Sequence, residues 1–233
     1  MKLKEVEMRY SKITEKFPRE FILLQGMGCF WKKCTFCDYF YDVSPNPFEI
    51  NLPVIEKISG ELGTLDIINS GSAMELDPQT LNALIHKIQE KNIKEIWFEV
   101  HWAYRNKLKS FSEKFKGRDV NFRVGVETFD GNLREKWNKG IPKEVTPEQI
   151  AKYFKSVCLL VGLPEQNLSS VVRDIQIAKK YFKRFVVSVF VKNSTPILPN
   201  TELIEQFIKD VYPKIKDDPQ VEVLINNTDL GVG

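Results

Sequence analysis

Three of the chain's four cysteines lie close together in one stretch rich in glycine and aromatic residues, 26–37. Four residues separate Cys29 from Cys34, and two separate Cys34 from Cys37. This spacing lets one short loop turn three thiolates toward a single metal centre. Three thiolates without a fourth nearby ligand suit a cubane iron–sulfur cluster that keeps one iron open. The sequence therefore predicts a metal centre at Cys29, Cys34 and Cys37.

Two other interpretations of these cysteines stay open at this point. A structural zinc site closes with four ligands. The only histidines are His86, which is more often a partly exposed position within a helix, and His101, while Asp38, directly after the loop, would be an unusual fourth ligand. Buried cysteines without a metal are the second alternative. The fourth cysteine, Cys158, stands alone in an apolar run and is interpreted as a small buried hydrophobic residue, not as a ligand.

The composition limits the class of protein. The chain has 233 residues, of which 42% are hydrophobic and 28% charged, and a net charge of +3. It therefore lacks the basic excess typical of nucleic-acid-binding proteins. The charged N-terminus does not resemble a signal peptide, and no apolar run reaches the length of a membrane span. Clustered cysteines indicate metal binding in a reducing compartment, so we expect a cytoplasmic protein that binds neither membranes nor nucleic acid.

The elements that must position the loop alternate along the chain. Apolar runs predict strands at 21–25, 65–69, 93–100, 122–127, 157–162, 185–191 and 221–225. Amphipathic patterns and cap–proline signals predict helices at 5–17, 54–62, from 77, 106–115, 132–137, from 146, 168–182 and 201–212. Strands that are continuous apolar runs are buried on both faces, as in parallel sheets covered by helices.

This alternation predicts an α/β fold with a single domain over residues 1–233. Six or seven strand–helix units fall short of the eight in a full barrel, so we expect a partial (β/α)6 TIM-like barrel, with an open doubly wound sheet as the alternative. The core is expected at residues 20–196, with an N-terminal helix and a C-terminal tail packed on it. In both architectures ligands bind at the carboxyl ends of the strands, where the cysteine loop begins.

Residues that could hold a ligand follow several of these strands. Gly71 lets a backbone approach a ligand closely and Ser72 adds a hydroxyl, although both also suit an ordinary turn. Glu127, at a strand end, can accept hydrogen bonds from hydroxyl or ammonium groups, or is a surface carboxylate. Glu99 and His101 point to the same side of a strand, so they could grip a polar heterocycle or pair with each other.

Further candidates follow the later strands. Arg105, Lys192 and Asn193 could each bind a carboxylate. The tail after the last predicted strand carries Asn227 and Asp229, which could offer amide and carboxylate groups to the edge of a base; a frayed polar terminus is the alternative. No residue is assigned a catalytic role.

The cysteine loop and the turn after the second strand resemble those of the radical S-adenosylmethionine (SAM) enzymes. Phe36 precedes the last cysteine, as in that family, whose usual loop has three residues between the first two cysteines where this chain has four. The turn Ser70-Gly71-Ser72 is similar to the family's motif for the methionine amino group. It has the form found in the branch that contains archaeosine synthase and the elongator-type tRNA enzymes.

Later segments extend the resemblance. Residues 123–128 and 138–140 are similar to the same branch, and 158–165 resembles the family's adenine-contacting segment, with Cys158 where a glycine is common. The resemblance covers residues 21–196 in family order.

The resemblance implies the cofactors. A [4Fe–4S] cluster on the three cysteines would be chelated at its open iron by the amino and carboxylate groups of SAM. One electron would cleave SAM to a 5′-deoxyadenosyl radical, which takes a hydrogen atom from the substrate. The cofactors carry this chemistry while the protein positions them and excludes water. The residues expected to bind SAM are Phe36, Gly71, Ser72, Glu127, Leu160 and Gly162, and the substrate candidates are Glu99, His101, Arg105, Asn227 and Asp229.

The resemblance also narrows the substrate and the partners. The chain has no extra cysteines for a second cluster and no recognisable RNA-binding segment, which favours a small molecule. The branch and the cysteine spacing imply a 7-deazapurine, and they point to a lyase that cleaves the C–N bond of queuine and releases 7-aminomethyl-7-deazaguanine. An external electron donor of the flavodoxin or ferredoxin type is implied, and the oligomeric state, including a dimer, stays open.

Two alternatives remain on the sequence alone. One is a radical SAM enzyme that modifies a base in tRNA, which would need a basic surface such as the lysines at 32–33, 107–109 and 179–183. Lysines so placed more often belong to solvated helix faces. The other is a non-enzymatic metal-binding or electron-transfer protein.

Overall fold

The computed structural model describes residues 8–232 and has an α/β fold. The strands are β1 (Tyr10–Ile13), β2 (Arg19–Leu24), β3 (Thr64–Asn69), β4 (Glu95–Glu99), β5 (Asp119–Glu127), β6 (Ser156–Val161), β7 (Arg184–Val189) and β8 (Val221–Leu224). The α-helices are α2 (Pro47–Glu56), α3 (Pro78–Glu90), α4 (Leu108–Ser112), α5 (Gly131–Lys136), α6 (Pro147–Ala151), α7 (Leu168–Tyr181), α8 (Thr201–Gln206) and α9 (Tyr212–Ile215). Short 3-10 helices are η1 (Tyr39–Tyr41), η2 (Ala73–Glu75) and η3 (Trp102–Lys107), and η4 (Phe207–Val211) is a π-helix.

The chain forms two compact units. Unit 1 holds the chain up to Phe30, Tyr39–Phe122 and the chain from Asn227 onward, whereas unit 2 holds Trp31–Asp38 and Arg123–Asn226. Within each unit the strands follow one another in sequence order: β1 to β4 lie in unit 1, β6 to β8 lie in unit 2, and the division falls within β5, after Phe122. The single domain over residues 1–233 stays a prediction.

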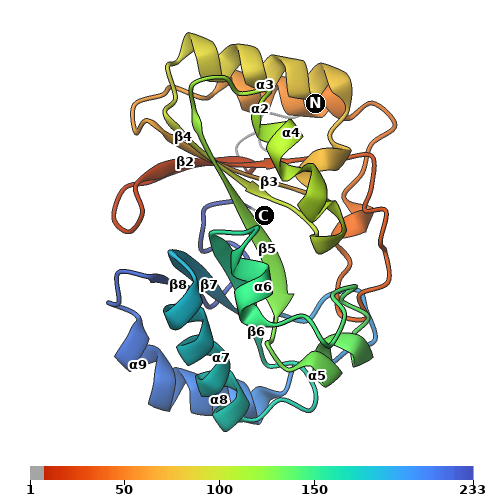
Figure 1. Ribbon diagram of the computed structural model, residues 1–233, viewed down its shortest axis with the longest axis vertical. Coiled ribbons are helices and arrows are strands. Elements are labelled where there is room, and N and C mark those ends of the chain that lie inside the picture. Colours follow the sequence, from red (N-terminus) through yellow and green to blue (C-terminus); the bar gives the residue numbers. More distant parts are fainter. Residues whose placement is uncertain (1–7, 233) are drawn as a thin grey trace. The chain divides into compact units, whose positions relative to one another are not determined.

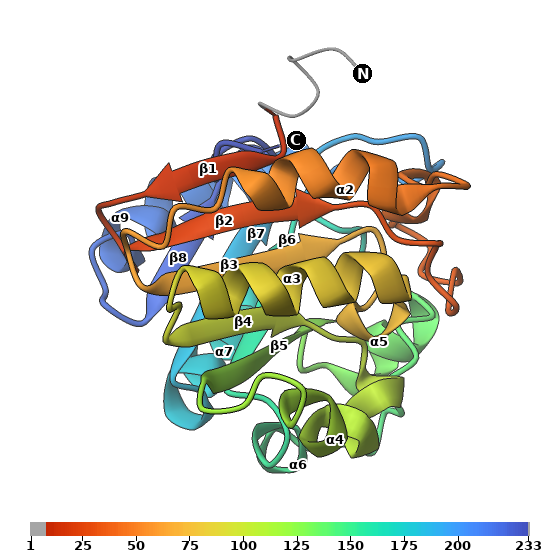
Figure 2. The ribbon, with the colours of Figure 1, turned by 90° about the horizontal axis from the view of Figure 1, so that it is seen from above.

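Unit 1 is built on three parallel strands. β2 pairs with β3, and β3 with β4, and helices α2 and α3 lie along this sheet (Figures 1 and 2). The apolar runs predicted as strands are buried here, with Ile22, Leu24 and Ile67 at most 1% exposed. Helix α3 begins at Asp77, whose carboxylate caps the first turn ahead of Pro78, as the cap–proline signal predicts.

Unit 2 repeats this arrangement with four parallel strands. β5 pairs with β6, β6 with β7, and β7 with β8. Helix α7 packs on β6 and β7 (Figure 1), and its buried side chains include Val171, Ile175 and Ala178. Their spacing of three to four residues places them on one face of the helix. The carboxyl ends of the strands in each unit carry the residues discussed below.

The N-terminal helix expected over 5–17 is wrong for the described part of that range. Residues 5–7 lie outside the described residues, and Tyr10–Ile13 forms the edge strand β1, antiparallel to β2. The Tyr10 hydroxyl donates a hydrogen bond of 2.8 Å to the carboxylate of Glu20, which is buried on β2. A helix-like spacing of apolar residues is a weak local signal, and a buried carboxylate that needs a donor overrides it.

Three helix boundaries also differ from the sequence-based prediction. Helix α2 begins at Pro47 instead of residue 54, since a proline fits the first turn of a helix. The helix expected over 106–115 is divided into η3 and α4. The helix expected over 201–212 passes through the π-helix η4 just before Pro213, which lacks the N–H that a regular helix would use.

The C-terminal tail packs on unit 1. The Ser11 hydroxyl on β1 donates a hydrogen bond to the Leu230 carbonyl, and Val232 is 5% exposed. The tail thus contacts the edge strand β1 at Leu230.

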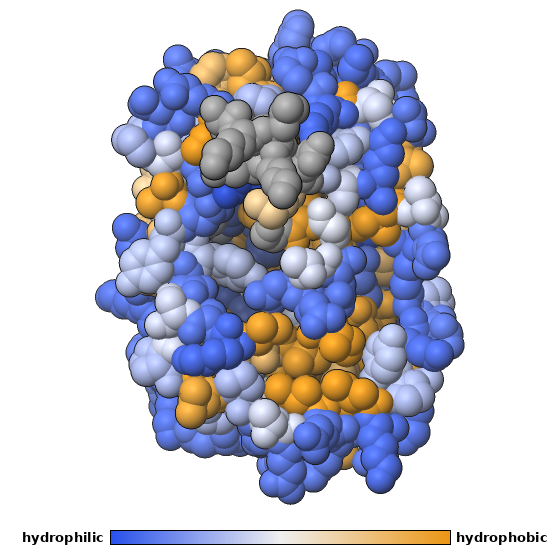
Figure 3. Space-filling model, turned by 180° about the vertical axis from the view of Figure 1, so that it is seen from behind, coloured by the Kyte–Doolittle hydropathy of each residue, from blue (hydrophilic) through white to orange (hydrophobic). Residues whose placement is uncertain are grey.

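The surface is mostly polar. Within residues 8–232, no helix has both the length and the apolar character needed to cross a membrane. Figure 3 shows one face of the molecule, on which apolar side chains gather in places among polar ones. The large apolar side chains that are exposed include Met27, Tyr39 and Tyr41, which flank the cysteine loop in the sequence.

Candidate active site

The first part of the cysteine loop lies against the Ser70-Gly71-Ser72 turn of unit 1. A Cβ atom on Gly71 would lie 2.8 Å from the Gly28 carbonyl oxygen and 3.2 Å from the Cα atom of Cys29. Only glycine permits this approach. The structure therefore brings together the first predicted metal ligand and the turn predicted to bind the amino group of SAM.

Glu75 joins these two segments, and the sequence analysis missed it. Its Oε1 accepts hydrogen bonds from the Phe30 N–H at 2.9 Å and the Tyr104 hydroxyl at 3.1 Å, and its Oε2 accepts one from the Ser72 N–H at 2.7 Å. Ser72 and Glu75 have the spacing of a capping box, which could have revealed the local bond. No local sequence pattern predicts the hydrogen bond to Phe30, which lies 45 residues away.

His101, a predicted substrate residue, lies beside the same turn. Its backbone N–H donates to the Ser72 hydroxyl at 3.3 Å, and its ring packs edge-to-face on Phe30 with centroids 5.5 Å apart. Its Nδ1 accepts the Ala103 N–H at 3.2 Å. A neutral imidazole that accepts at Nδ1 carries its proton on Nε2. His101 is thereby fixed as a hydrogen-bond donor through Nε2.

Tyr104 also packs edge-to-face on Phe30. The two ring centroids are 5.2 Å apart. Burial and the neighbouring Glu75 carboxylate raise the pKa of Tyr104 to about 12. The hydroxyl therefore remains a neutral donor to Glu75 at physiological pH.

The other predicted substrate residues of unit 1 occupy varied positions. Glu99 ends β4 and is half-buried. The Arg105 guanidinium stacks 4.6 Å from the centroid of the Trp102 ring and donates to the Trp102 carbonyl oxygen at 3.3 Å. Asn227 and Asp229 are exposed on the tail. Whether these residues contact a substrate stays a prediction.

The second part of the cysteine loop is packed into unit 2. Phe36, Trp137, Leu163 and Phe190 form a buried cluster, and the partly buried residues packed against it include Cys34, Cys37 and Leu160. The Phe36 and Trp137 rings meet edge-to-face at 6.2 Å between centroids. Two predicted metal ligands and two predicted SAM residues thus share one apolar wall.

Backbone contacts fix this half of the loop to the segment that follows α5. The Thr35 N–H donates to the Trp137 carbonyl oxygen at 3.1 Å, and the Trp31 indole N–H donates to the Asn138 carbonyl oxygen at 2.5 Å. A Cβ atom on Gly140, whose φ is +75°, would lie 2.6 Å from the Trp31 ring. Segment 138–140, which the sequence analysis identified, therefore contacts the cysteine loop and helps to hold it in place.

The turn after β7 holds the loop from another direction. The Asn193 side-chain amide donates to the Phe36 carbonyl oxygen at 2.7 Å, and the Ser194 N–H and hydroxyl both donate to one Asp38 oxygen at 2.8 Å. Asp38 and Asn193 thus anchor the loop. This structural role is enough to explain why both residues are present, without either of them having to bind a metal or SAM. The Lys192 ammonium donates to the Ile197 carbonyl oxygen at 3.1 Å.

Glu127 ends β5 in an unusual backbone conformation. Its φ is +64° and the register to β6 shifts between Gly125 and Glu127. Its Oε1 accepts a hydrogen bond from the Lys139 ammonium at 2.6 Å, and the two side chains are 10% and 13% exposed. Burial would lower the pKa of Lys139, but the carboxylate of Glu127 and the thiolate of Cys34 raise it well above its usual value.

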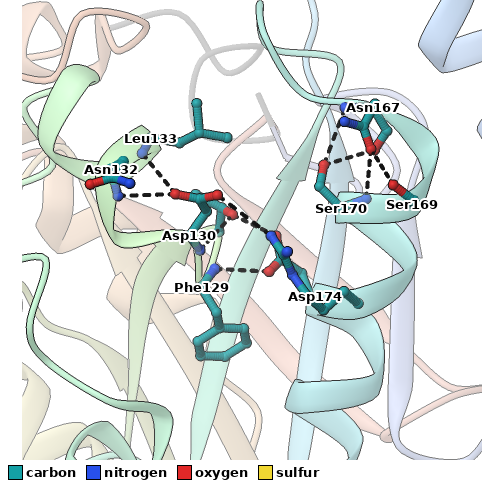
Figure 4. Close-up of polar contacts among 10 residues, drawn as sticks. Phe129, Asp130, Asn132, Leu133, Asn167, Ser169, Ser170 and Asp174 are labelled. Atoms are coloured by element: carbon teal, nitrogen blue, oxygen red, sulfur yellow. Dashed lines mark hydrogen bonds and ion pairs between the residues drawn. The ribbon is translucent and has the colours of Figure 1, made fainter.

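The segment after Glu127 is held by Asp174 on α7 (Figure 4). The Thr128 hydroxyl donates to Asp174 at 2.6 Å, and the Phe129 N–H donates to its other oxygen at 3.0 Å. Burial raises the pKa of the Asp174 carboxyl, although the bond from Thr128 opposes the shift. Asp130 then caps the first turn of α5. This arrangement fixes the chain directly after the strand end.

The end of β6 carries two predicted SAM residues, Leu160 and Gly162. Gly162 has a φ of +100°, and a Cβ atom there would lie 2.6 Å from Ile204. The side-chain amide of Gln166 donates to the Leu160 carbonyl oxygen at 2.7 Å and accepts from the N–H groups of Gly162 and Leu163 at 3.0 and 2.9 Å. The sequence analysis missed Gln166, which rigidifies this strand end.

The donor set is consistent with a thiolate-bound metal centre. All four cysteines lie among the described residues, and they are thiols that form no disulfide. Cys29 belongs to unit 1, and Cys34 and Cys37 belong to unit 2. Among residues 8–232, no group of three or more His, Cys, Asp or Glu side chains is arranged as a metal site. The chemistry of the three thiols, not a coordination geometry, carries the fit to an iron–sulfur cluster.

Parallel strands, a three-cysteine loop after β2 and a Ser-Gly-Ser turn after β3 define a radical SAM enzyme. The chain is 38% identical to the queuine lyase from Clostridium spiroforme, solved with SAM and queuine bound. The match has a TM-score of 0.92 and covers 97% of this chain and 99% of that one. The chain belongs to the queuine lyase family.

Two other proteins match this chain less closely. The heme chaperone HemW of Buchnera aphidicola is 26% identical over 172 residues, which is 64% of this chain but only 45% of that protein. This chain therefore spans just under half the length of the curated relative it matches. Streptococcus suis SuiB, at 15% identity, has a TM-score of 0.52 over 89% of this chain and 50% of its own, and supports the fold alone. No family model matches the chain.

These matches confirm the predicted fold class. The high TM-score to the Clostridium spiroforme enzyme over nearly the whole chain shows the partial TIM-like barrel of the radical SAM type. The doubly wound alternative is thereby set aside.

Proposed function

We propose that this chain reductively cleaves SAM and uses the resulting radical to break the C–N bond of queuine, which releases 7-aminomethyl-7-deazaguanine. The observation that carries the proposal is the full-length, 38% identical match to a queuine lyase bound to SAM and queuine. Neither tRNA-base modification nor a non-enzymatic metal module has a comparable observation in its favour.

Cys29, Cys34 and Cys37 are proposed to hold a [4Fe–4S] cluster. When bound, this cluster supplies the electron that cleaves SAM at its open iron. The chain's own contribution is to hold the three thiols on a braced loop and to wall off part of their surroundings. The cluster of Phe36 and Trp137, packed against Cys34 and Cys37, supplies that wall.

The residues proposed to bind SAM follow three of the strands. Gly71 and Ser72 receive the amino group, because their turn lies directly beside Cys29. Glu127 receives the ribose hydroxyls, with its carboxylate orientation set by Lys139. Leu160 and Gly162 face the adenine, on a strand end that Gln166 stiffens. Phe36 lines the same site from the cysteine loop.

Queuine is proposed to bind near His101 and Glu99. With its proton on Nε2, His101 offers a donor to an acceptor on the substrate. Glu99 offers an acceptor to the N–H groups of a purine-like ring. Arg105, Asn227 and Asp229 are secondary candidates for polar contacts at the edge of the same substrate.

Several finer statements belong to the proposal as well. The chain is proposed to act as a single domain on a small molecule in the cytoplasm, with an external donor of the flavodoxin or ferredoxin type. The proposal leaves both a monomer and a dimer open.

The test is an anaerobic assay. The protein is reconstituted with iron and sulfide, supplied with SAM and a strong reductant, and assayed for 5′-deoxyadenosine with and without queuine. We expect deoxyadenosine formation that queuine stimulates, together with 7-aminomethyl-7-deazaguanine. If deoxyadenosine forms at the same rate with and without queuine, queuine is excluded as the substrate but the chain remains a radical SAM enzyme. If the protein binds zinc in place of iron, both the substrate and the enzyme class are excluded.

Two variants sharpen this test. Cys37→Ala is expected to lose iron and all deoxyadenosine formation, whereas Cys158→Ala keeps its iron. His101→Phe keeps the ring packing on Phe30 but removes the Nε2–H donor, so we expect about a tenfold loss of queuine affinity, the usual size for one hydrogen bond. Unchanged queuine affinity in His101→Phe would exclude His101 as a substrate contact.

A further inference from the structure

An ion pair in unit 2 occupies a position that neither binding nor fold stability alone accounts for. Lys139 and Glu127 meet at 2.6 Å with side chains 13% and 10% exposed. A second pair lies close by in the sequence, where Lys136 meets Glu165 at the same distance but with 61% and 47% exposure. Exposed pairs contribute little to stability, whereas taking charges out of water is costly. The buried pair therefore calls for a reason beyond stability.

The backbone around the pair is shaped to admit it. A Cβ atom on Gly125 would lie 2.6 Å from the Glu127 Oε1 and 2.9 Å from the Lys139 Nζ. Any side chain at position 125 would push the two charged groups apart. Glu127 itself adopts a left-handed φ of +64°, which is unfavourable for a residue other than glycine. Both features indicate that the position of this pair is maintained at some cost.

The cation also lies beside the cysteine loop. The Lys139 Nζ is 5.8 Å from the centroid of the Phe36 ring. Phe36 lies between Cys34 and Cys37 in the sequence, and both cysteines pack against its buried cluster. Because the region is shielded from water, the ammonium charge acts on the thiolates through a low effective dielectric.

We propose that Lys139 is a positioning residue with an additional electrostatic role: it orients Glu127 and its fixed positive charge makes the centre bound by Cys34 and Cys37 easier to reduce. This inference rests on the proposed function, since it requires a redox centre at those cysteines. Adding an electron to an anionic thiolate-bound cluster increases its negative charge, and a nearby cation stabilises that reduced form. Local charge is one of the established determinants of cluster potential.

The test compares the midpoint potential of the cluster among variants, measured without SAM or queuine. Lys139→Met removes the charge at similar length, and we expect a more negative midpoint potential. A tenfold weakening of reduction corresponds to a shift of about 59 mV for a one-electron couple. Lys139→Arg keeps the charge and should keep the potential near that of the wild type. Lys136→Met is the matched control, because it removes an equally paired but exposed charge, and should leave the potential unchanged.

A variant with the opposite sign keeps the proposal testable if Lys139→Met does not load iron. Glu127→Gln leaves the ammonium in place without its counter-charge, so we expect a less negative potential. An unchanged potential in Glu127→Gln, or in an iron-loaded Lys139→Met, would overturn the electrostatic role. A merely structural role would lower iron content alike in Lys139→Met and Lys139→Arg, without an ordered change in potential.

This inference and the proposed function fail in different ways. If the wild-type protein takes up no iron–sulfur cluster, the proposed function falls and the inference falls with it. If the wild type carries a reducible cluster and cleaves SAM, but the potentials of the variants coincide, only the role of Lys139 is lost.

Discussion

The two parts of the cysteine loop are held by different physical means. In unit 1, the Cys29 side is braced by hydrogen bonds, since the Glu75 carboxylate gathers the N–H groups of Phe30 and Ser72. In unit 2, the Cys34 and Cys37 side packs against a buried aromatic cluster and is also held by hydrogen bonds such as those of Thr35 and Asn193. The first brace depends on one charged group, whereas the second combines filled volume with several neutral hydrogen bonds, so the two should respond to different substitutions.

The largest expected effect comes from breaking the packed side. Trp137→Ala removes a side chain that is 4% exposed, and such truncations cost about 3–5 kcal/mol of unfolding free energy. We expect that loss in urea unfolding of the metal-free protein, together with reduced iron uptake. Phe111→Ala, in the aromatic cluster of unit 1, is the matched control and should lose similar stability while iron uptake per folded molecule stays unchanged. Equal iron uptake in both variants would contradict a special role for the packed side.

Breaking the hydrogen-bonded side should cost less. Glu75→Gln turns one acceptor oxygen into a donor that faces a backbone N–H, and we expect a loss of about 1–3 kcal/mol, the range for bonds to a charged group. Iron uptake should fall as well, since Phe30 adjoins Cys29. Glu90→Gln, on the exposed end of α3, serves as control in the same unfolding and iron assays. If the two variants behave alike, Glu75 is not a brace.

Tyr104→Phe sharpens the comparison by removing one of the three donors to Glu75. A single hydroxyl hydrogen bond contributes about 1 kcal/mol, so the loss should be smaller than for Glu75→Gln. Because the pKa of Tyr104 is raised from 10 to about 12, its stabilising contribution is complete below pH 10 and is lost as the pH rises through the folded-state value. The difference in phenolate absorbance between wild type and variant should show one tyrosine titrating near pH 12.

A series of unfolding measurements at different pH values tests Asp174, a carboxylate in unit 2 that also accepts a backbone N–H. Its substitution should have the smallest effect on stability. In Asp174→Asn the amide can still accept from the Phe129 N–H and donate to the Thr128 hydroxyl, so little stability is lost. Burial raises the pKa of Asp174, so its protonated form is favoured in the folded state. The wild type should therefore gain stability relative to the variant as the pH falls, and lose that advantage as the pH rises through the shifted pKa. Parallel pH–stability curves would exclude a raised pKa.

Much of this organisation could be predicted from the sequence. The three parallel strands of unit 1 and the four of unit 2 follow from apolar runs, because strands buried on both faces have no polar alternation. The three cysteines and the Ser-Gly-Ser turn were recognisable because each motif is local and dense in unusual residues. In the structure, Gly71 lies against Cys29.

The parts that escaped prediction depend on contacts between distant segments. Glu75 was overlooked because its partner, the Phe30 N–H, belongs to another segment. The ion pair of Lys139 with Glu127 was overlooked because it depends on the space left by Gly125. The edge strand β1 was misassigned because Tyr10 pairs through a hydroxyl with Glu20, a bond that no periodicity reports. In each case a side chain satisfies a polar group elsewhere in the chain, and such pairing is invisible to patterns read along the sequence.

The backbone conformation at Glu127 has a consequence for protein engineering. A non-glycine residue with a φ of +64° carries a conformational cost on the order of 1–3 kcal/mol, which a glycine at that position would relieve. Selection for heat resistance alone would therefore reward replacement of Glu127, in conflict with its proposed role in binding SAM. A directed-evolution campaign on this enzyme should screen for both properties at once, or it will enrich robust proteins that no longer work.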